Sequence, residues 1–122
     1  MGFVTYSPTG KTGFLGVRKE TMDRYGLTSE YVAREMAEGA LRQEACCADI
    51  AIANTGVADA VPGGGPPPGT QCFAWSYRTR DGEINTFTET RVFHGERNEI
   101  RRAAALYALS RTEHYFDQQW RR

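Results

Sequence analysis

Lys11 is the residue whose type and setting most directly suggest chemistry. The chain of 122 residues has only one other lysine, Lys19, and its remaining Lys/Arg positions are arginines. A lysine acts as a base only when its surroundings lower its pKa. Lys11 also lies in Thr9-Gly10-Lys11-Thr12, which is similar to the end of a phosphate-binding P-loop. The full motif needs a glycine five positions before Gly10, where the chain has Thr5, so the sequence indicates no site for a nucleoside triphosphate.

The segment from Thr55 to Gly69 is a second candidate site, because it contains Gly63-Gly64-Gly65 followed by Pro66-Pro67-Pro68. Glycines after a strand let backbone N–H groups approach an anion. A flexible crossover rich in proline and glycine is the alternative interpretation. A loop of this length in a small domain is usually functional or disordered. The sequence pattern therefore fits two interpretations of this segment, an anion-binding loop or a flexible connection without a binding role.

The cysteines and histidines indicate no metal chemistry. Three cysteines, with Cys46 and Cys47 adjacent and Cys72 apart, fit neither a disulfide framework nor a zinc site. We therefore expect buried, reduced thiols and no metal or cofactor. His94 and His114 lie in no recognisable motif and are expected at the surface.

Composition excludes several classes of protein. Fifteen Lys and Arg residues balance fifteen Asp and Glu residues, so the net charge is zero and no global field attracts nucleic acid or an anionic membrane. No apolar run approaches the roughly 18 residues of a bilayer span, and the first residues do not resemble a signal peptide. We expect one cytoplasmic domain over residues 1–122, with no nucleic-acid or membrane partner.

The order of predicted elements indicates a layered α/β fold, with helices on both faces of a mixed sheet. The last predicted helix has a broad apolar stripe that includes Leu106, Leu109 and Phe116. Phe73, Trp75 and Tyr77 alternate along one predicted strand and are expected in the core, and Asp81-Gly82 predicts a hairpin turn after that strand. The predicted elements are a strand over 2–6 that ends in a turn at Ser7-Pro8-Thr9-Gly10, a helix over 18–25, a helix capped by Thr28 that runs to about Cys46, strands over 48–53, 71–79 and 83–93, and a helix over 96–120.

Several short motifs occur in an order that is specific when they are taken together. They are Tyr6-Ser7-Pro8-Thr9-Gly10-Lys11, Leu15-Gly16-Val17, the helix segment from Val32 to Ala40, Thr55-Gly56-Val57-Ala58, Pro68-Gly69-Thr70, and Gly95-Glu96-Arg97 with Ile100-Arg101. Over nearly all of its length the chain resembles the C-terminal domain of the competence/damage-inducible protein A (CinA) family. Active members of that family are amidases that convert nicotinamide mononucleotide to the nicotinate form and ammonia.

The resemblance implies roles for particular residues. Lys11 and Tyr6 match the family positions of a base and its neighbour, which would accept the proton of a serine nucleophile. Arg97 and Arg101, one helical turn apart, are expected either to pair with acidic residues such as Glu96 or Asp49 or to hold the last helix to the sheet or loop. The positions expected to bind a nucleotide-like substrate are Thr55, Gly56, Gly64, Gly69 and Thr70.

The chain also departs from the family pattern. Pro8 replaces an asparagine, Asp59-Ala60 replaces a Gly-Pro step, and Pro66 replaces a lysine. These changes remove donors or add negative charge where a phosphate would lie. In the family, a helix, a strand and a Ser-Cys-Thr-Gly-Gly motif with the presumed nucleophile precede the point at which this sequence begins.

We therefore expect a protein that is inactive on its own as an amidase. Two alternatives stay open, namely an active amidase completed by another chain or by further sequence, and a non-catalytic oligomeric or ligand-binding module. We also expect a homo-oligomer, most simply a two-fold dimer, because the fold would have an exposed sheet edge near residues 2–6 and an uncovered apolar face. Phe3 or Trp120 would be buried between the chains.

Overall fold

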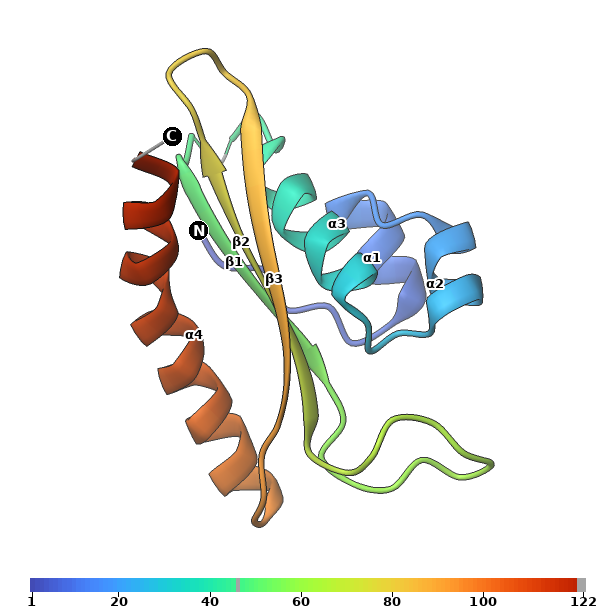
Figure 1. Cartoon of the computed structure of the whole chain (residues 1–122). Helices are drawn as coiled ribbons and strands as arrows, with labels where there is room; N and C mark the ends of the chain where they lie inside the picture. The colour runs from blue at the N-terminus through green and yellow to red at the C-terminus, as the bar shows by residue number, and fades with distance from the viewer. Residues whose placement is uncertain (46, 121–122) are drawn as a thin grey trace.

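The computed structural model describes residues 1–45 and 47–120, and these form one sheet between two helical layers (Figure 1). On one side of the sheet α3 packs against the strands and α1 and α2 pack against α3, while the long helix α4 covers the other face (Figure 1). The expected α/β architecture with helices on both faces is confirmed. The elements in chain order are α1 (Pro8–Leu15), α2 (Lys19–Tyr25), α3 (Glu30–Leu41), β1 (Ile50–Gly56), β2 (Thr70–Arg78), β3 (Ile84–Val92) and α4 (Arg97–Trp120).

The three described strands form a sheet in the order β1-β2-β3. Both pairings are antiparallel, so the parallel pairing that a mixed sheet requires is not among these three strands. In the register, Ile52 lies opposite Trp75, and Trp75 lies opposite Phe87. The turn at Asp81-Gly82 joins β2 to β3, which confirms the predicted hairpin.

The core on the α4 side is aromatic. Phe73, Trp75 and Tyr77 alternate along β2, point to this face, and are buried as the sequence predicted. The Trp75 indole N–H donates to the Ala108 carbonyl at 2.9 Å, and the Tyr77 hydroxyl donates to the Thr112 carbonyl at 2.6 Å. These bonds satisfy the polar atoms of two buried rings and fix the position of α4 on the sheet.

The opposite face packs small residues, which brings α3 close to the sheet. Ala33 and Ala37 of α3 pack against Ala53, Cys72 and Ala74 of the strands. Gly39 of α3 makes a close approach to another helix, because an added Cβ would lie 1.6 Å from the Leu15 carbonyl oxygen of α1. A glycine is therefore required where α3 crosses the end of α1.

The amino-terminal region differs from the sequence prediction. Residues 2–6 form no strand, and the expected turn at 7–10 is the start of α1. Ser7 caps this helix by accepting a bond from the Gly10 N–H at 3.0 Å, and Pro8 stands at its first position. Serine, proline and glycine are typical of turns, but Ser followed by Pro is also a helix start. Residues 7–10 therefore start a helix, although their composition fits a turn equally well.

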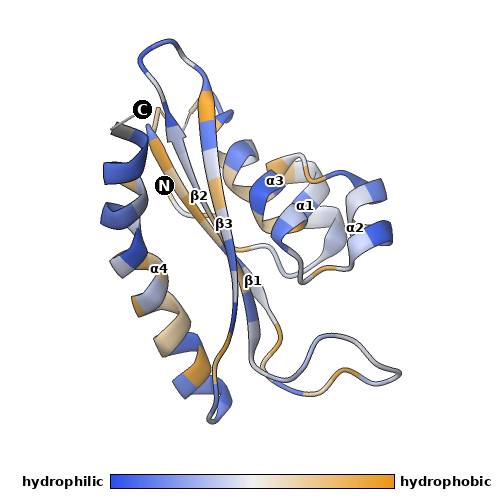
Figure 2. Ribbon diagram, in the orientation of Figure 1, coloured by the Kyte–Doolittle hydropathy of each residue, from blue (hydrophilic) through white to orange (hydrophobic). Residues whose placement is uncertain are grey.

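Two helix predictions were also partly wrong. The cap of α3 is Ser29 rather than Thr28, and the helix ends at Leu41 instead of continuing to about residue 46, which itself lies outside the described residues. In α4, Leu106 and Leu109 are exposed, at 61% and 66%. The residues buried there include Ala104, Ala108 and Tyr115. Most of α2 and the carboxyl-terminal half of α4 are hydrophilic (Figure 2).

Candidate functional site

Lys11 is buried although it belongs to a short helix near the surface. The residue is 8% exposed, and its Nζ donates to the Thr5 carbonyl oxygen at 3.0 Å. Burial lowers the pKa of the Lys11 ammonium. A carbonyl oxygen partly replaces the water that the ammonium has lost. A larger fraction of this amine is therefore neutral than in a surface lysine, and only the neutral amine can act as a base.

The other residues of the amino-terminal motif lie apart from the Lys11 amine. Tyr6 is 95% exposed, whereas Lys11 is buried, so the structure does not bring this expected pair together. The Ser7 hydroxyl oxygen accepts the Gly10 N–H and caps α1. Among the described residues, the Lys11 amine is therefore positioned as a proton acceptor, but no serine hydroxyl is hydrogen-bonded to it.

Four of the five predicted substrate-binding residues meet at one end of the sheet. Thr55 and Gly56 end β1, while Thr70 begins β2 beside them and Gly69 directly precedes it. The Gly69 N–H donates to the Val57 carbonyl at 2.9 Å, and the Thr70 N–H donates to the Pro67 carbonyl at 3.1 Å. These two amides are thus engaged within the fold and do not point at an anion.

The side chains at this end are also engaged. The Thr55 hydroxyl donates to the Leu27 carbonyl at 3.0 Å, and the Thr70 hydroxyl donates to the Pro67 carbonyl at 2.6 Å. The Gln71 side chain lies over Gly56, where an added Cβ would be 2.2 Å from its amide. This end of the sheet is closed by its own contacts.

Gly64 lies in the projecting loop between β1 and β2 (Figure 1). Its φ is +101°, and its N–H donates to the Val61 carbonyl at 3.2 Å. The base of the loop is connected to α4, because Arg97 lies 2.9 Å from the Asp59 carboxylate. Arg97 therefore pairs with the loop rather than with Glu96 or Asp49. Arg101 is exposed on α4.

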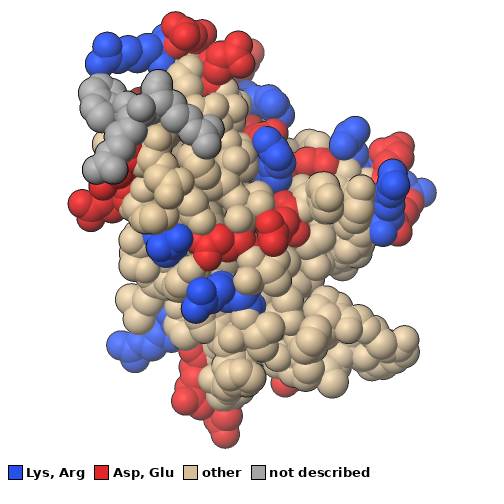
Figure 3. All heavy atoms as spheres, in the orientation of Figure 1, with Lys and Arg blue, Asp and Glu red and all other residues tan. Residues whose placement is uncertain are grey.

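The loop base and Lys11 form two separate groups. Among the residues that the structure describes, no hydrogen bond or ion pair joins Lys11 to Thr55, Gly69 or Arg97. Figure 3 shows acidic and basic side chains interspersed on the face in view, with no extended area of one sign. The candidate site thus consists of a buried amine at α1 and a loop stabilised at its base by one exposed ion pair.

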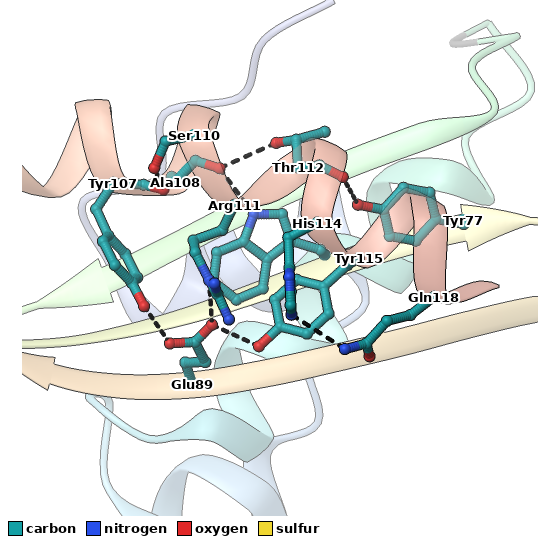
Figure 4. A network of polar contacts seen from close by, with 11 residues as sticks. Tyr77, Glu89, Tyr107, Ala108, Ser110, Arg111, Thr112, His114, Tyr115 and Gln118 are labelled. Carbon is teal, nitrogen blue, oxygen red and sulfur yellow. Dashed lines mark hydrogen bonds and ion pairs between the residues drawn. The ribbon is translucent and has the colours of Figure 1, made fainter. Parts of the chain in front are cut away.

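A polar network between β3 and α4 was missed by the sequence analysis (Figure 4). The Glu89 carboxylate accepts bonds from the hydroxyls of Tyr107 and Tyr115, and the Arg111 Nε lies 3.0 Å from it. Burial alone would raise the pKa of Glu89, but the hydrogen bonds from Tyr107, Tyr115 and Arg111 outweigh this effect, so the pKa lies below the ordinary value. The available signal was the spacing of 107, 111 and 115, which puts these three residues on one helix face opposite an acidic strand residue.

The described residues contain neither a metal-binding cluster nor a helix that could span a membrane. Within residues 1–45 and 47–120, no three His, Cys, Asp or Glu side chains gather where they could hold a metal ion. Cys72 is buried and Cys47 is exposed, so the expectation of buried thiols was wrong for Cys47. His94 and His114 are exposed, as predicted. None of the helices in the described part of the chain has the length and hydrophobicity of a bilayer span.

The fold and the lysine-bearing helix define a class of α/β domain, and comparison with known proteins identifies it. The model of the CinA C-terminal domain matches residues 1–116. The chain therefore belongs to the CinA C-terminal domain family.

Similar proteins include the nicotinamide-nucleotide amidohydrolase PncC of Shigella flexneri, which is 45% identical over 88% of this chain and 62% of its own length. A CinA-like protein of Akkermansia muciniphila is 41% identical over 89% of this chain and 25% of its own length. The crystal structure of a competence or damage-inducible protein from Enterobacter asburiae has a TM-score of 0.77 and 38% identity, over 89% of this chain and 65% of that one. The chain thus spans between a quarter and two thirds of these relatives.

Proposed function

We propose that this chain contributes the proton-accepting part of a nicotinamide-nucleotide amidase site, and that residues 1–122 alone do not hydrolyse nicotinamide mononucleotide. The supporting observation is the setting of Lys11. Its amine is buried and donates to the Thr5 carbonyl at 3.0 Å, and burial lowers its pKa. The similarity to an amidohydrolase at 45% identity gives the chemical class of the substrate.

The proposed chemistry is hydrolysis of the nicotinamide amide through a serine. Lys11 Nζ accepts the proton of the serine hydroxyl, the serine oxygen bonds to the amide carbon, and the C–N bond breaks as ammonia leaves with a proton. Water then hydrolyses the resulting ester and regenerates the serine. The lowered pKa of Lys11 favours the first step, because a neutral amine is needed to accept a proton.

The proposed inactivity rests on the surroundings of this amine. Its described hydrogen bond goes to a backbone carbonyl, and the Ser7 hydroxyl is engaged at the start of α1. Neither group can be a nucleophile for Lys11 in this arrangement. Loss of a nucleophile typically removes many orders of magnitude in rate, so a base alone gives no useful turnover.

Completion by further polypeptide is a second candidate, favoured by the 62% of the Shigella flexneri relative that this chain spans. A serine supplied from elsewhere would turn the same lysine into part of an active amidase. We place the protein in the cytoplasm in either case, because both described cysteines are free thiols, as expected in a reducing compartment.

The test is a chimera in which the Ser-Cys-Thr-Gly-Gly segment of the family precedes Met1. We expect the chimera to release ammonia from nicotinamide mononucleotide, and Lys11→Met to lower kcat by at least about 100-fold, the usual contribution of an acid–base group. Lys19→Met, which removes the other lysine from an exposed position at the start of α2, is the matched control and should leave kcat unchanged.

Two results would refute the assignment of Lys11. One is a folded chimera whose activity survives Lys11→Met. The other is a folded chimera, with the native circular dichroism spectrum, that binds the nucleotide but releases no ammonia. Retained activity in Lys11→Met would leave the amidase class standing and remove only the role of the lysine.

A further inference from the structure

Glu35 of α3 is a largely buried carboxylate that the proposed function does not use. Its side chain is 18% exposed. Its Oε1 accepts the Arg18 N–H at 2.8 Å, its Oε2 accepts the Thr21 hydroxyl at 2.5 Å, and the Arg18 guanidinium lies 3.4 Å from it. Burial alone would raise the pKa of Glu35, but the bonds from Arg18 and Thr21 outweigh this effect and hold the pKa below its ordinary value. The group is therefore a carboxylate at neutral pH.

This carboxylate completes the start of α2 from another helix. Arg18 is the N-cap of α2, and its own side chain makes no cap bond. In a capping box, a glutamate three residues after the N-cap accepts the N-cap N–H. Thr21 occupies that position in α2, and Glu35 of α3 accepts both the Arg18 N–H and the Thr21 hydroxyl. The first turn of α2 is thus attached to α3.

The attachment reaches Lys11 through one further residue. Val17 directly precedes Arg18, is completely buried, and donates its N–H to the Lys11 carbonyl at 3.1 Å. Val17 also belongs to one hydrophobic cluster with Val32 of α3. The backbone of Lys11 is therefore tied to the junction of α1 and α2, while its Nζ is bonded to the Thr5 carbonyl.

Glu35 belongs to a line of positions on α3 that faces α1 and α2. Residues four apart share one face of a helix. Gly39 lies against the Leu15 carbonyl, and Gln43, just beyond α3, donates its amide N–H to the Phe14 carbonyl. Gly39 and Gln43 thus contact the end of α1, and Glu35 holds the start of α2.

We propose that Glu35 is a positioning residue for Lys11, because its carboxylate fixes the junction of α1 and α2 and thereby keeps the Lys11 amine buried. The inference rests on the proposed function for its catalytic meaning, since a base must be largely neutral. Without the carboxylate, the Arg18 N–H and the Thr21 hydroxyl lose their acceptor, and the junction opens to water. Water then solvates the charged form of the amine, and the pKa of Lys11, which burial lowers, rises.

The titration of Lys11 in the unaltered-length chain tests this proposal without catalysis. Lys11 and Lys19 are the only lysines of the sequence, so isotope-labelled lysine gives one NMR signal for each side-chain amine, and Lys11→Met assigns them. Lys19 is exposed and serves as the internal reference. We expect Lys11 to lose its proton at a lower pH than Lys19. Glu35→Ala should raise the midpoint of Lys11 toward that of Lys19.

Two conservative variants separate the position of the carboxylate from its charge. Glu35→Asp keeps the charge, but its side chain is one methylene shorter and cannot reach both donors, so it should also raise the Lys11 midpoint. Glu35→Gln keeps the reach and can still accept the Arg18 N–H, so it should leave the midpoint unchanged. If Glu35 acted only through its charge, Glu35→Gln would lower the midpoint, because a nearby anion favours the ammonium. That result would contradict the positioning role.

Glu38 is the matched control on the same helix. Its side chain is also 18% exposed, but its carboxylate accepts the Thr86 hydroxyl of β3 at 2.7 Å and pairs with Arg34 at 3.0 Å. Glu38→Ala and Glu38→Asp should therefore leave the Lys11 midpoint unchanged, even where they lower stability.

Three results would overturn the proposal. They are an unchanged Lys11 midpoint in Glu35→Asp with a native circular dichroism spectrum, an equal rise in Glu35→Asp and Glu38→Asp, and equal midpoints of the two lysines in the unaltered chain. The amidase assignment is tested separately by ammonia release from the chimera, so failure of the positioning role and failure of the proposed function are distinguishable.

Discussion

The Nζ of Lys11 lies 3.0 Å from the carbonyl oxygen of Thr5, six residues earlier in the chain. This bond joins the start of α1 to the segment that precedes it and holds the amine in a site that is 8% exposed. A buried lysine is costly to a small domain, because the charged form loses hydration. The same cost lowers the pKa of the ammonium and favours the neutral amine, which is the form that can accept a proton.

The pH dependence of stability should reveal the lowered pKa of Lys11. The pKa is lowered by burial in the folded state and returns to about 10.4 in the unfolded state. Between these two values the unfolded chain binds more protons, so the unfolding free energy rises with pH. We expect the unaltered chain to gain stability relative to Lys11→Met as the pH rises from neutrality toward the unfolded-state pKa of about 10.4. Denaturant unfolding at several pH values checks this, and parallel curves would show that the lysine is not perturbed.

Two helical glycines should respond in opposite directions to alanine. At Gly39 an added Cβ would lie 1.6 Å from the Leu15 carbonyl oxygen, so Gly39→Ala should lower the unfolding free energy by about 3 kcal/mol. At Gly13, in α1, an added Cβ meets nothing within 4 Å. Gly13→Ala should raise the unfolding free energy by about 0.5 to 1 kcal/mol. Thermal melts of both variants would show the sign of each change, and equal shifts would refute the packing of α3 on α1.

Glu89 should anchor α4 to β3. Glu89→Ala leaves the hydroxyls of Tyr107 and Tyr115 without their described acceptor, and should cost about 2 to 3 kcal/mol of unfolding free energy. Glu83→Gln, at the exposed hairpin turn, is the control and should change it by less than about 0.5 kcal/mol.

The pKa of Glu89 gives a second, independent readout of this network. The hydrogen bonds hold its pKa below the ordinary value, which the unfolded chain regains at about 4.3. Its contribution is complete above that pH and is lost as the pH falls toward the folded-state pKa. The stability difference between the unaltered chain and Glu89→Gln should therefore shrink as the pH falls below about 4.3. A constant difference over that range would contradict the network.

The ion pair between Arg97 and Asp59 should limit anion binding at the projecting loop. The two groups are 64% and 74% exposed, so the pair should contribute little to stability. Asp59→Gly removes a negative charge and frees the Arg97 guanidinium, and it should raise the affinity for nicotinamide mononucleotide severalfold in calorimetry. Adding Arg97→Gln should abolish the gain. Micromolar binding by the unaltered chain would show that Asp59 does not obstruct the loop.

The sequence predicted the elements whose patterns are long or unambiguous. The hairpin at Asp81-Gly82, the aromatic core on β2 and the length of α4 follow from strong turn and periodicity signals. The start of α1 was missed because Ser7 and Pro8 fit both a turn and a helix cap. Residues 2–6 have strand-forming side chains but form no strand here, since pairing depends on distant partners that local patterns do not encode.

The candidate site was only partly predictable for the same reason. Lys11 stood out by its rarity, and its burial agrees with a special role. The Gly69 and Thr70 N–H groups donate to carbonyls of the same loop, and these bonds depend on the loop's conformation, which its composition does not specify. The partner of Arg97 was likewise not evident from sequence, because Asp59 is 38 residues away.

Ammonia release from nicotinamide mononucleotide is the measurement that tests the central claim most directly. The purified 122-residue chain should be assayed beside the Shigella flexneri amidohydrolase at equal concentration, with Lys11→Ala as a third sample. We expect release by the relative and none above the blank for the chain, since no nucleophile is placed on the buried amine. Release at a rate comparable to that of the relative, and abolished by Lys11→Ala, would contradict the claim that residues 1–122 alone are inactive.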